Sequence, residues 1–397
     1  MGRLRILICG AGIAGPALAH WLLPAGCETT LLERAPAFRN SGYMIDIWGV
    51  GYEILERYGL LEAARQRGYL FDRLQFVNAR GAEVAAVGGE VFRRALGGRF
   101  FSLPRGDLAE VLYESLQGRA EVLYGTSVAA LHPHAAGVEV ELSSGARRGF
   151  DAVVGADGLH SRVRELAFGA QPDCLKYLGY VAASFVAEGY PHRDEGVYVS
   201  LARPGRQLSR YAMRGGRSAF LFVFADPQAR GAGAHDRAAQ NALLRERFAH
   251  DGWETAQILE RLEAADELYF DSVSQVRLPR WTDAGARVAL LGDAAYSPSL
   301  LAGAGAAFAM LGAYVMAAEL RRCAGEVAPA FAGYEQRLRP FMHEQQRAAA
   351  RFAGSFAPRT ALGLQLRNRV LGLMNLPAVG PWLARRMFGG TLTLPVD

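Results

Sequence analysis

Lysine is almost absent from this 397-residue chain, which narrows its range of partners. Lys176 is the only lysine, so the net charge of +5 comes almost entirely from arginine. The arginines are scattered, with no Lys/Arg run interleaved with aromatic residues. A GC-rich genome, which uses arginine as its surface cation, accounts for them. We therefore expect no nucleic-acid partner.

Cysteine and metal-binding patterns are also scarce. The four cysteines (Cys9, Cys27, Cys174 and Cys323) lie far apart and form no CxxC pair. This favours reduced thiols in a cytoplasmic protein over a disulfide framework or a zinc site. The eight histidines include no HxxxH or HExxH pattern, so we expect no metal.

Long uncharged runs are few as well. Two segments could be mistaken for a membrane span or a signal peptide, and both fit a globular protein better. Residues 300–320 are nearly uncharged until Glu319, which is close to spanning length. They are rich in glycine and alanine and follow a glycine loop, so we expect a buried helix and no membrane span. Arg3 and Arg5 precede an apolar run, as in a signal peptide. A glycine turn interrupts that run, which predicts a first β-strand.

Apolar residues make up 51% of the chain, enough for a large core, and the length suggests two or three domains. The segment ILICGAGIAGPALAHWLLPAGCETTLLER, residues 6–34, predicts a βαβ dinucleotide-binding unit. Gly10 permits the tight turn, Gly12 a close approach to a pyrophosphate, and Gly15 close packing of helix on strand. Glu33 stands 18 residues after Gly15, so it can reach the ribose hydroxyls.

Two later strands end in similar turns. An apolar strand leads into GADGLHSRVR, residues 155–164, and another into GDAAYSP, residues 292–298, which precedes Gly303-Ala304-Gly305 and a long helix. Turns at the carboxyl ends of strands can carry a ligand site, although an ordinary strand–helix turn explains the first equally well. Arg105 precedes another predicted helix, either as a cofactor contact or as a surface cation near a cap.

The middle of the chain has a different pattern. Short alternating runs between residues 178 and 224 are separated by Gly/Pro turns, which predicts an antiparallel sheet. Its large side chains could line an apolar substrate pocket on one face or serve as plain core: Tyr198, Tyr211, Met213, Phe222 and Phe224. Residues 52–68 predict one amphipathic helix. Residues 330–353 and 359–388 predict helices, the second broken at Pro377 and Pro381.

Taken together, GAGIAG, GADGLHSRVR and GDAAYSP resemble the FAD-dependent class A aromatic-ring monooxygenases of the p-hydroxybenzoate hydroxylase type. IDIWG, RGDL, GWETAQIL and YFDSVSQVRLPRW resemble, more closely, the tetracycline destructase branch. The resemblance implies non-covalent FAD, reduced by NADPH or NADH. It also implies O2 activation as a flavin C4a-hydroperoxide and hydroxylation of an aromatic or enolic polycyclic, tetracycline- or polyketide-like substrate, with a role in antibiotic resistance.

The resemblance also implies roles for individual residues. Gly10, Gly12 and Gly15, with Ile13 and Ala14, would hold the FAD pyrophosphate, and Glu33 the adenosine ribose, with Arg34 beside it. Arg39 stands where the destructase pattern has an arginine linked to NADPH, and Asp157 would be shared between FAD and nicotinamide handling. The remaining FAD contacts would be Asp46, Arg105, Asp293, Pro298, Gly303, Ala304 and Gly305. This chain has Gly303-Ala304-Gly305-Ala306 where many relatives have Gly-Gln-Gly-Asn, and Trp48 where they often have a basic residue. No side chain is assigned as a catalytic acid or base.

The expected fold is α/β, with a Rossmann-like FAD-binding domain of the GxGxxG type, an inserted antiparallel-sheet substrate domain and C-terminal helices. We expect the FAD-binding domain to comprise residues 1–72, 101–172 and 279–325, the substrate domain residues 73–100 and 173–278, and the helices residues 326–397. Two other functions stay open, a flavin-dependent reductase or dehydrogenase on the same fold and a weakly catalytic flavoprotein that binds a polyketide or antibiotic. The sequence does not separate a monomer from a dimer.

Overall fold

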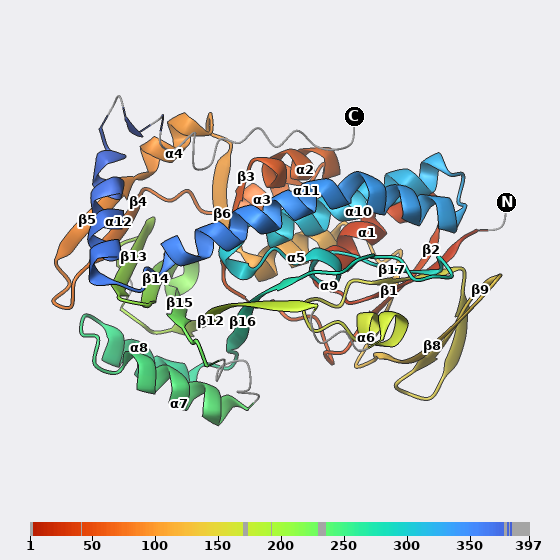
Figure 1. Cartoon of the computed structure of the whole chain (residues 1–397), viewed down its shortest axis with the longest axis horizontal. Helices are drawn as coiled ribbons and strands as arrows, with labels where there is room; N and C mark the ends of the chain where they lie inside the picture. Colours follow the sequence, from red (N-terminus) through yellow and green to blue (C-terminus); the bar gives the residue numbers. More distant parts are fainter. Residues whose placement is uncertain are drawn as a thin grey trace.

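The computed structural model describes residues 3–40, 42–169, 174–191, 193–228 and 236–376, together with residues 379, 380 and 382. Two sheets lie side by side along the long axis, with helices above and below them (Figure 1). The expected α/β class, with a Rossmann-like parallel sheet, a second mainly antiparallel sheet and C-terminal helices, is confirmed.

The parallel sheet has five strands in the order β17-β11-β1-β2-β7. Its central strands are buried because they consist almost entirely of apolar residues covered on both faces. The strands are β1 (Arg5–Cys9), β2 (Glu28–Glu33), β7 (Glu121–Tyr124), β11 (Ala152–Gly155) and β17 (Val288–Leu290). All four pairings are parallel, so the carboxyl ends of β1, β2, β11 and β17 lie at one edge.

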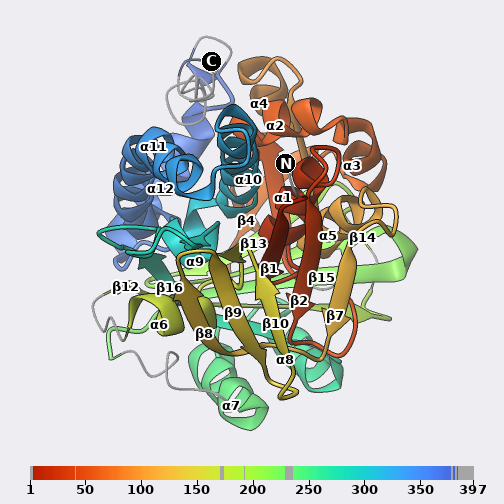
Figure 2. The ribbon, with the colours of Figure 1, turned by 90° about the vertical axis from the view of Figure 1, so that its right-hand side faces the viewer.

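Helices cover one face of this sheet and a small antiparallel sheet covers the other (Figures 1 and 2). On the first face lie α1 (Ala14–Leu22), α2 (Val50–Tyr58), α3 (Leu61–Arg67), α5 (Arg105–Glu114) and α10 (Gly305–Arg322). The small sheet is made of β8 (Val128–His134), β9 (Gly137–Leu142) and β10 (Arg147–Phe150), with α6 (Arg162–Phe168) beside it. The short ribbon β3 (Met44–Trp48) and β6 (Phe100–Pro104) belongs to neither sheet.

The second large sheet has seven strands in the order β16-β12-β15-β14-β13-β4-β5 and is antiparallel except for the parallel pair β13–β4. Its strands are β4 (Arg73–Val77), β5 (Glu83–Gly88), β12 (Leu175–Glu188), β13 (Val197–Arg203), β14 (Arg206–Met213), β15 (Arg217–Ala225) and β16 (Tyr269–Val276). Apolar residues of α7 (Arg237–Phe248) and α8 (Thr255–Ala264) cover one face.

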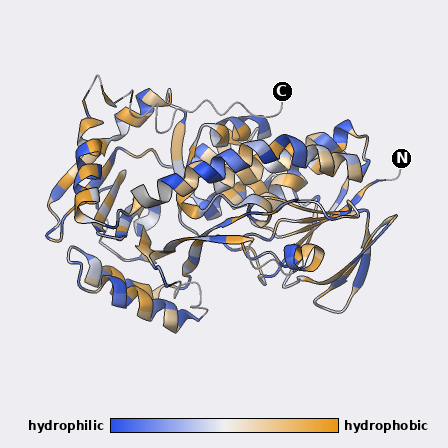
Figure 3. Ribbon diagram, in the orientation of Figure 1, coloured by the Kyte–Doolittle hydropathy of each residue, from blue (hydrophilic) through white to orange (hydrophobic). Residues whose placement is uncertain are grey.

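Four further α-helices lie in the described chain, among them the short α9 (Asp293–Tyr296), which follows β17. The 30-residue α11 (Val327–Phe356) runs above both sheets, and α12 (Ala361–Leu373) lies against β5 and β13 (Figure 1). Both appear where the sequence predicts helices, whereas Pro377 and Pro381 lie outside the described residues. The peripheral helices α7, α11 and α12 carry both hydrophilic and hydrophobic residues, as amphipathic helices do (Figure 3). A short α4 (Gly89–Ala95) follows β5.

One expectation about the helices is wrong. Residues 52–68 do not form a single helix, because Gly59 adopts φ 69° and ends α2, and α3 begins at Leu61. A glycine in the left-handed region is a common end of a helix, since it has no Cβ to clash there. The helical spacing of apolar residues continues across Gly59. The sequence pattern therefore gave no sign that the helix ends there.

Candidate functional site

The glycine turn after β1 leaves no room for side chains. Gly10 has φ +110°, and a Cβ there would lie 2.4 Å from the carbonyl oxygen of Ala156. A Cβ on Gly15 would lie 1.9 Å from the carbonyl oxygen of Gly10. No side chain caps the start of α1, so its first N–H groups can bind an anion. This arrangement fits a pyrophosphate.

The carboxylate of Glu33 is held beside this turn. Its Oε2 accepts a hydrogen bond from the Ala11 N–H at 3.1 Å, and its Oε1 accepts one from the Ala35 N–H at 2.9 Å. The end of β2 and the glycine loop are therefore joined through one side chain, at the position where a ribose would follow the pyrophosphate. Arg34 and Arg39, predicted as neighbours of the cofactor, are both exposed.

Arg105 brings a positive charge to the same turn. Its Nη2 lies 3.5 Å from the position that a Cβ on Gly12 would occupy, and its backbone N–H donates to the Tyr43 carbonyl at 3.0 Å. Its charge reaches Asp293, where it opposes the desolvation that raises the pKa of that carboxyl. Arg105 thus lies between the glycine turn and the later GD turn.

Two predicted FAD contacts are aspartates that combine access to solvent with desolvation. Asp46 and Asp293 are exposed to solvent, yet the surrounding protein desolvates both and raises the pKa of each carboxyl. Both carboxyls can therefore be reached by a ligand, in surroundings that disfavour their charge. Asp46 also accepts a hydrogen bond from the Ser102 hydroxyl at 2.6 Å, which partly offsets its rise in pKa.

The DG and GD turns are tied together by a buried arginine. Arg164 of α6 donates to the Ala294 carbonyl at 3.1 Å and to the Leu159 carbonyl at 2.7 Å. Asp157 accepts hydrogen bonds at the start of α6, from the Ser161 hydroxyl at 2.5 Å and the Val163 N–H at 3.0 Å. Both oxygens of Asp157 therefore organise the turn itself.

The late proline and glycine loop lies where α10 begins. The Pro298 carbonyl accepts a hydrogen bond from the Gln275 side chain at 3.0 Å, which anchors the loop to β16. A Cβ on Gly305 would lie 3.6 Å from Asp293 Oδ1, and no side chain caps the start of α10 at Ala304. Gly303 adopts φ 65°. The loop therefore presents backbone N–H groups next to the Asp293 carboxyl.

The predicted substrate residues do not all share one face, and that expectation is wrong for two of them. Tyr198 stacks on Tyr211 with ring centroids 4.3 Å apart, and Met213 packs in the same cluster. Phe222 and Phe224 point to the opposite face, where both rings contact Phe248 of α7. Side chains alternate along a strand, and these two phenylalanines occupy the positions that face α7 and α8.

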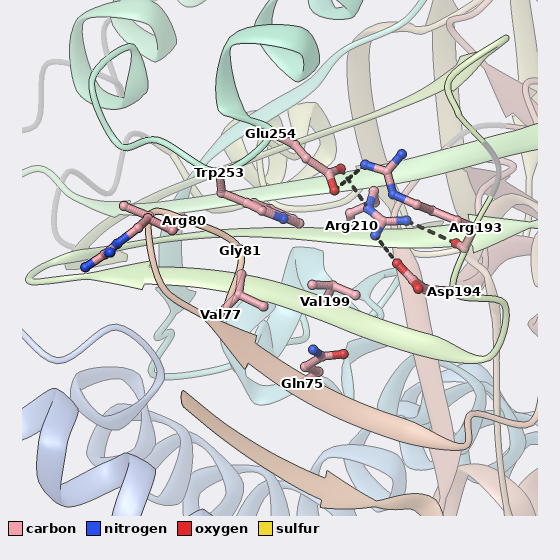
Figure 4. Close-up of a pocket in the computed structure, with 11 residues that line it drawn as sticks. Gln75, Val77, Arg80, Gly81, Arg193, Asp194, Val199, Arg210, Trp253 and Glu254 are labelled. Carbon is pink, nitrogen blue, oxygen red and sulfur yellow. Dashed lines mark hydrogen bonds and ion pairs between the residues drawn. The ribbon is translucent and has the colours of Figure 1, made fainter. Parts of the chain in front are cut away.

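A second recess, of about 520 Å³, lies on that outer face and contains none of the predicted site residues. Figure 4 shows the guanidinium of Arg210 between Asp194 and Glu254, with the Trp253 indole nearby. Arg210 lies 2.5 Å from Asp194 Oδ2 and 3.1 Å from Glu254 Oε2, and Arg193 also pairs with Glu254. The charges compensate one another, and the cluster ties α8 to β14.

Several residues near Arg105 and Asp293 were not singled out from the sequence. Tyr43 and Tyr269 make an edge-to-face contact at 5.1 Å, and desolvation raises the pKa of Tyr43 to about 12. The His160 Nε2 lies 3.1 Å from Asp271. Tyr269 and Asp271 belong to the YFDSVSQVRLPRW segment that carried the resemblance, so a signal was present. Their pairing with Tyr43 and His160 was not visible, because those partners lie more than 100 positions earlier.

Comparison with known proteins decides the family. Residues 3–345 match the family described as "FAD binding domain". A flavin-dependent monooxygenase from an unknown prokaryotic organism is 32% identical over 377 residues, covering 93% of this chain and 96% of the relative. The chain belongs to this family of FAD-dependent monooxygenases.

Two further comparisons agree with this. An uncharacterized protein of Mycobacterium tuberculosis is 36% identical to this chain over 350 residues, which cover 86% of this chain and 91% of that protein. The crystal structure of tetracycline destructase Tet(51) superposes with a TM-score of 0.82 at 29% identity, covering 94% of this chain and 96% of the other. The resemblance to the class A enzymes and the destructase branch is thus confirmed.

The residues around these turns fit FAD. The start of α1 offers N–H groups to a pyrophosphate, Glu33 lies beside the glycine turn where a ribose would follow, and Asp46 and Asp293 are open to solvent. Within the described residues, no three His, Cys, Asp or Glu side chains are grouped so as to hold a metal ion. No helix in the described ranges is both long and apolar enough to cross a bilayer.

Proposed function

We propose that this FAD-dependent monooxygenase uses NADPH or NADH and O2 to hydroxylate an aromatic or enolic polycyclic substrate of the tetracycline or polyketide type. The observation that carries the proposal is the aromatic cluster of Tyr198, Tyr211 and Met213, in which Tyr198 is the member that solvent can reach. Desolvation and the Asp46 charge raise the pKa of Tyr198. An accessible aromatic ring beside a carboxyl suits a planar, oxygen-rich ring system.

The protein's part would be to position the reactants and exclude water. Gly10, Gly12, Gly15 and the start of α1 would hold the pyrophosphate, and Glu33 the ribose. Asp293, Pro298 and residues 303–305 would lie along the ring system, with Arg105 supplying positive charge. The redox chemistry, hydride acceptance and oxygen activation, is supplied by FAD when it is bound. Asp46 lies close enough to Tyr198 for its charge to raise the pKa of that hydroxyl. Bound FAD and substrate would displace water from the reacting atoms.

The decisive experiment measures NADPH oxidation, oxygen uptake and incorporation of labelled oxygen into product, with a panel of tetracyclines, anthracyclines and simple phenols. The proposal expects substrate-dependent NADPH oxidation with one labelled oxygen per product. Turnover under strict anaerobiosis would favour the reductase alternative. A flavin that NADPH fails to bleach, with or without ligand, would favour the binder, for which the Gly303-Ala304-Gly305 loop is the motivating observation.

A pair of variants tests whether Tyr198 contacts the substrate. Tyr198→Phe removes a hydroxyl enclosed beside Asp46, and we expect KM to rise about ten-fold, the effect of losing one hydrogen bond, with little change in kcat. Tyr190→Phe is the matched control, because its hydroxyl bonds to Glu254 on the opposite face of the sheet. Equal KM values for Tyr198→Phe and wild type would remove Tyr198 from the substrate site.

A further inference from the structure

The outer side of α12 carries apolar side chains that no described residue covers. Leu362, Leu366 and Leu373 are 76%, 63% and 48% exposed. With Arg369 they follow the spacing that places residues on one face of a helix. The opposite face is occupied, since Leu371 and Met374 pack in the cluster of Phe71 and Tyr198. Exposed apolar side chains grouped in this way mark an interaction surface.

Along the sequence, the segment that contains α12 carries charge of one sign. Residues 345–396 contain seven arginines and no acidic residue. Because the whole chain has a net charge of +5, the remaining 345 residues carry −2. The density of arginine in this segment is ordinary, and what distinguishes it is the absence of Asp and Glu. This asymmetry, in a protein that is otherwise slightly acidic, predicts an anionic partner.

In the described part of the chain, the arginines of this segment form no ion pair. Five of them are described, at positions 347, 351, 359, 367 and 369, and no carboxylate lies within 4.0 Å of any of these five. Arg359 and Arg367 instead contact backbone carbonyls and aromatic rings of the protein. Elsewhere exposed arginines are commonly paired, as Arg147 is with Glu139 and Glu141. Arg369, exposed on the leucine face itself, is therefore free to meet an external negative charge.

We propose that the outer face of α12 docks the enzyme peripherally onto an anionic phospholipid bilayer. Leucines on one face beside an exposed arginine, here Arg369, are the pattern of an interfacial helix. Anionic lipid headgroups attract such an arginine. A two-fold contact with a second copy is disfavoured, because it would bring two Arg369 side chains without ion pairs together.

Docking in this orientation has a functional consequence. Asn375, just after α12, donates to the Ala86 carbonyl at 2.6 Å and accepts from the Gly88 N–H at 3.1 Å, so this end of the helix is fixed to the β4–β5 hairpin. Leu371 and Met374 at this end of the helix belong to the same packed cluster as Tyr198. The lipid surface would thus lie next to the region that we propose binds an apolar substrate, although the docking itself does not rest on the substrate proposal.

The test uses the purified full-length holoenzyme and vesicles of phosphatidylcholine, with or without phosphatidylglycerol, in a co-sedimentation assay. We expect binding only to vesicles that contain phosphatidylglycerol, weakening as salt rises. Leu362→Gln combined with Leu366→Gln should lower partitioning at least about ten-fold, and Arg369→Gln about five-fold. Leu70→Gln and Arg147→Gln, exposed residues outside α12, are the matched controls and should bind as wild type does.

Three results would overturn the proposal. They are no binding to phosphatidylglycerol vesicles, equal binding to phosphatidylcholine alone, and partitioning that the α12 variants leave unchanged. A fourth would come from light scattering after gel filtration. If wild type is a dimer and the double leucine variant is a monomer, the outer face of α12 binds a second copy of the chain and not a bilayer. Flavin absorbance and thermal midpoint confirm folding of each variant. If the double variant lost its flavin, Arg369→Gln alone would decide, since it removes no apolar contact.

Discussion

At the scale of single residues, Gly15 sets the tightest constraint in the cofactor region. We expect Gly15→Ala to destabilise the protein by about 3 kcal/mol or more and to yield a preparation with little bound FAD, because the new Cβ would fall 1.9 Å from the Gly10 carbonyl oxygen. Thermal unfolding and flavin absorbance measure both effects. Gly149→Ala is the control, since nothing lies within 4 Å of its Cβ position. Retained FAD in Gly15→Ala would contradict the proposed role of the turn.

His160 gives the protein a pH-dependent contact at the DG turn. The hydrogen bond to Asp271 raises the pKa of His160 above its ordinary value of 6.5, against opposing charges on Arg164 and Arg34. The pair therefore stabilises the fold fully below the unfolded-state pKa, and this contribution is lost as pH rises through the higher folded-state pKa. We expect the thermal midpoint of His160→Gln to fall below that of wild type at about pH 5.5 and to match it at about pH 8.5. A gap that widened with rising pH would contradict this assignment.

At the scale of elements, the cluster of Arg210, Asp194 and Glu254 should hold α8 onto the seven-stranded sheet. Glu254 is largely buried between Arg193 and Arg210, so Glu254→Gln leaves a buried guanidinium with less compensation. We expect a loss of about 3 kcal/mol in stability, read from the denaturation midpoint. Glu263→Gln, on the same helix and paired with Arg245 at the surface, should change stability by less than about 1 kcal/mol. Similar losses in both variants would show that the cluster contributes little.

Elements also show where sequence reasoning succeeds and where it fails. The GAGIAG turn was predictable because glycine spacing, strand and acidic residue act within 34 residues, a local signal. The faces of β15 were not, because alternation tells that Phe222 and Phe224 share a side but not which side, and only the packing of Phe248 decides that. Gly59 ended a helix inside a continuous apolar pattern. The contacts of Tyr43 with Tyr269 and of His160 with Asp271 join distant segments, which one sequence cannot pair.

At the scale of the whole molecule, bound FAD should stabilise the protein through both its flavin portion and its adenosine diphosphate portion. After removal of flavin, we expect added FAD at a hundred-fold excess over its Kd to restore about 2.7 kcal/mol. FMN should restore much less, because it lacks the adenosine diphosphate portion that the glycine turn and Glu33 are proposed to hold. Differential scanning fluorimetry compares the two ligands. Equal stabilisation by FMN and FAD would mean that the glycine turn does not bind the pyrophosphate.

The strand order has a consequence for how the chain is made. β1 pairs with β11, almost 150 residues later, and β17 completes that edge only at residues 288–290. Likewise β4 must wait for β13, about 120 residues downstream, before its parallel pairing can form. Such distant pairings slow folding, so the first strand of the nascent polypeptide stays unmatched on one side until residues 152–155 have been synthesised. Chaperone dependence during synthesis should therefore exceed that of proteins whose sheets close between neighbouring strands.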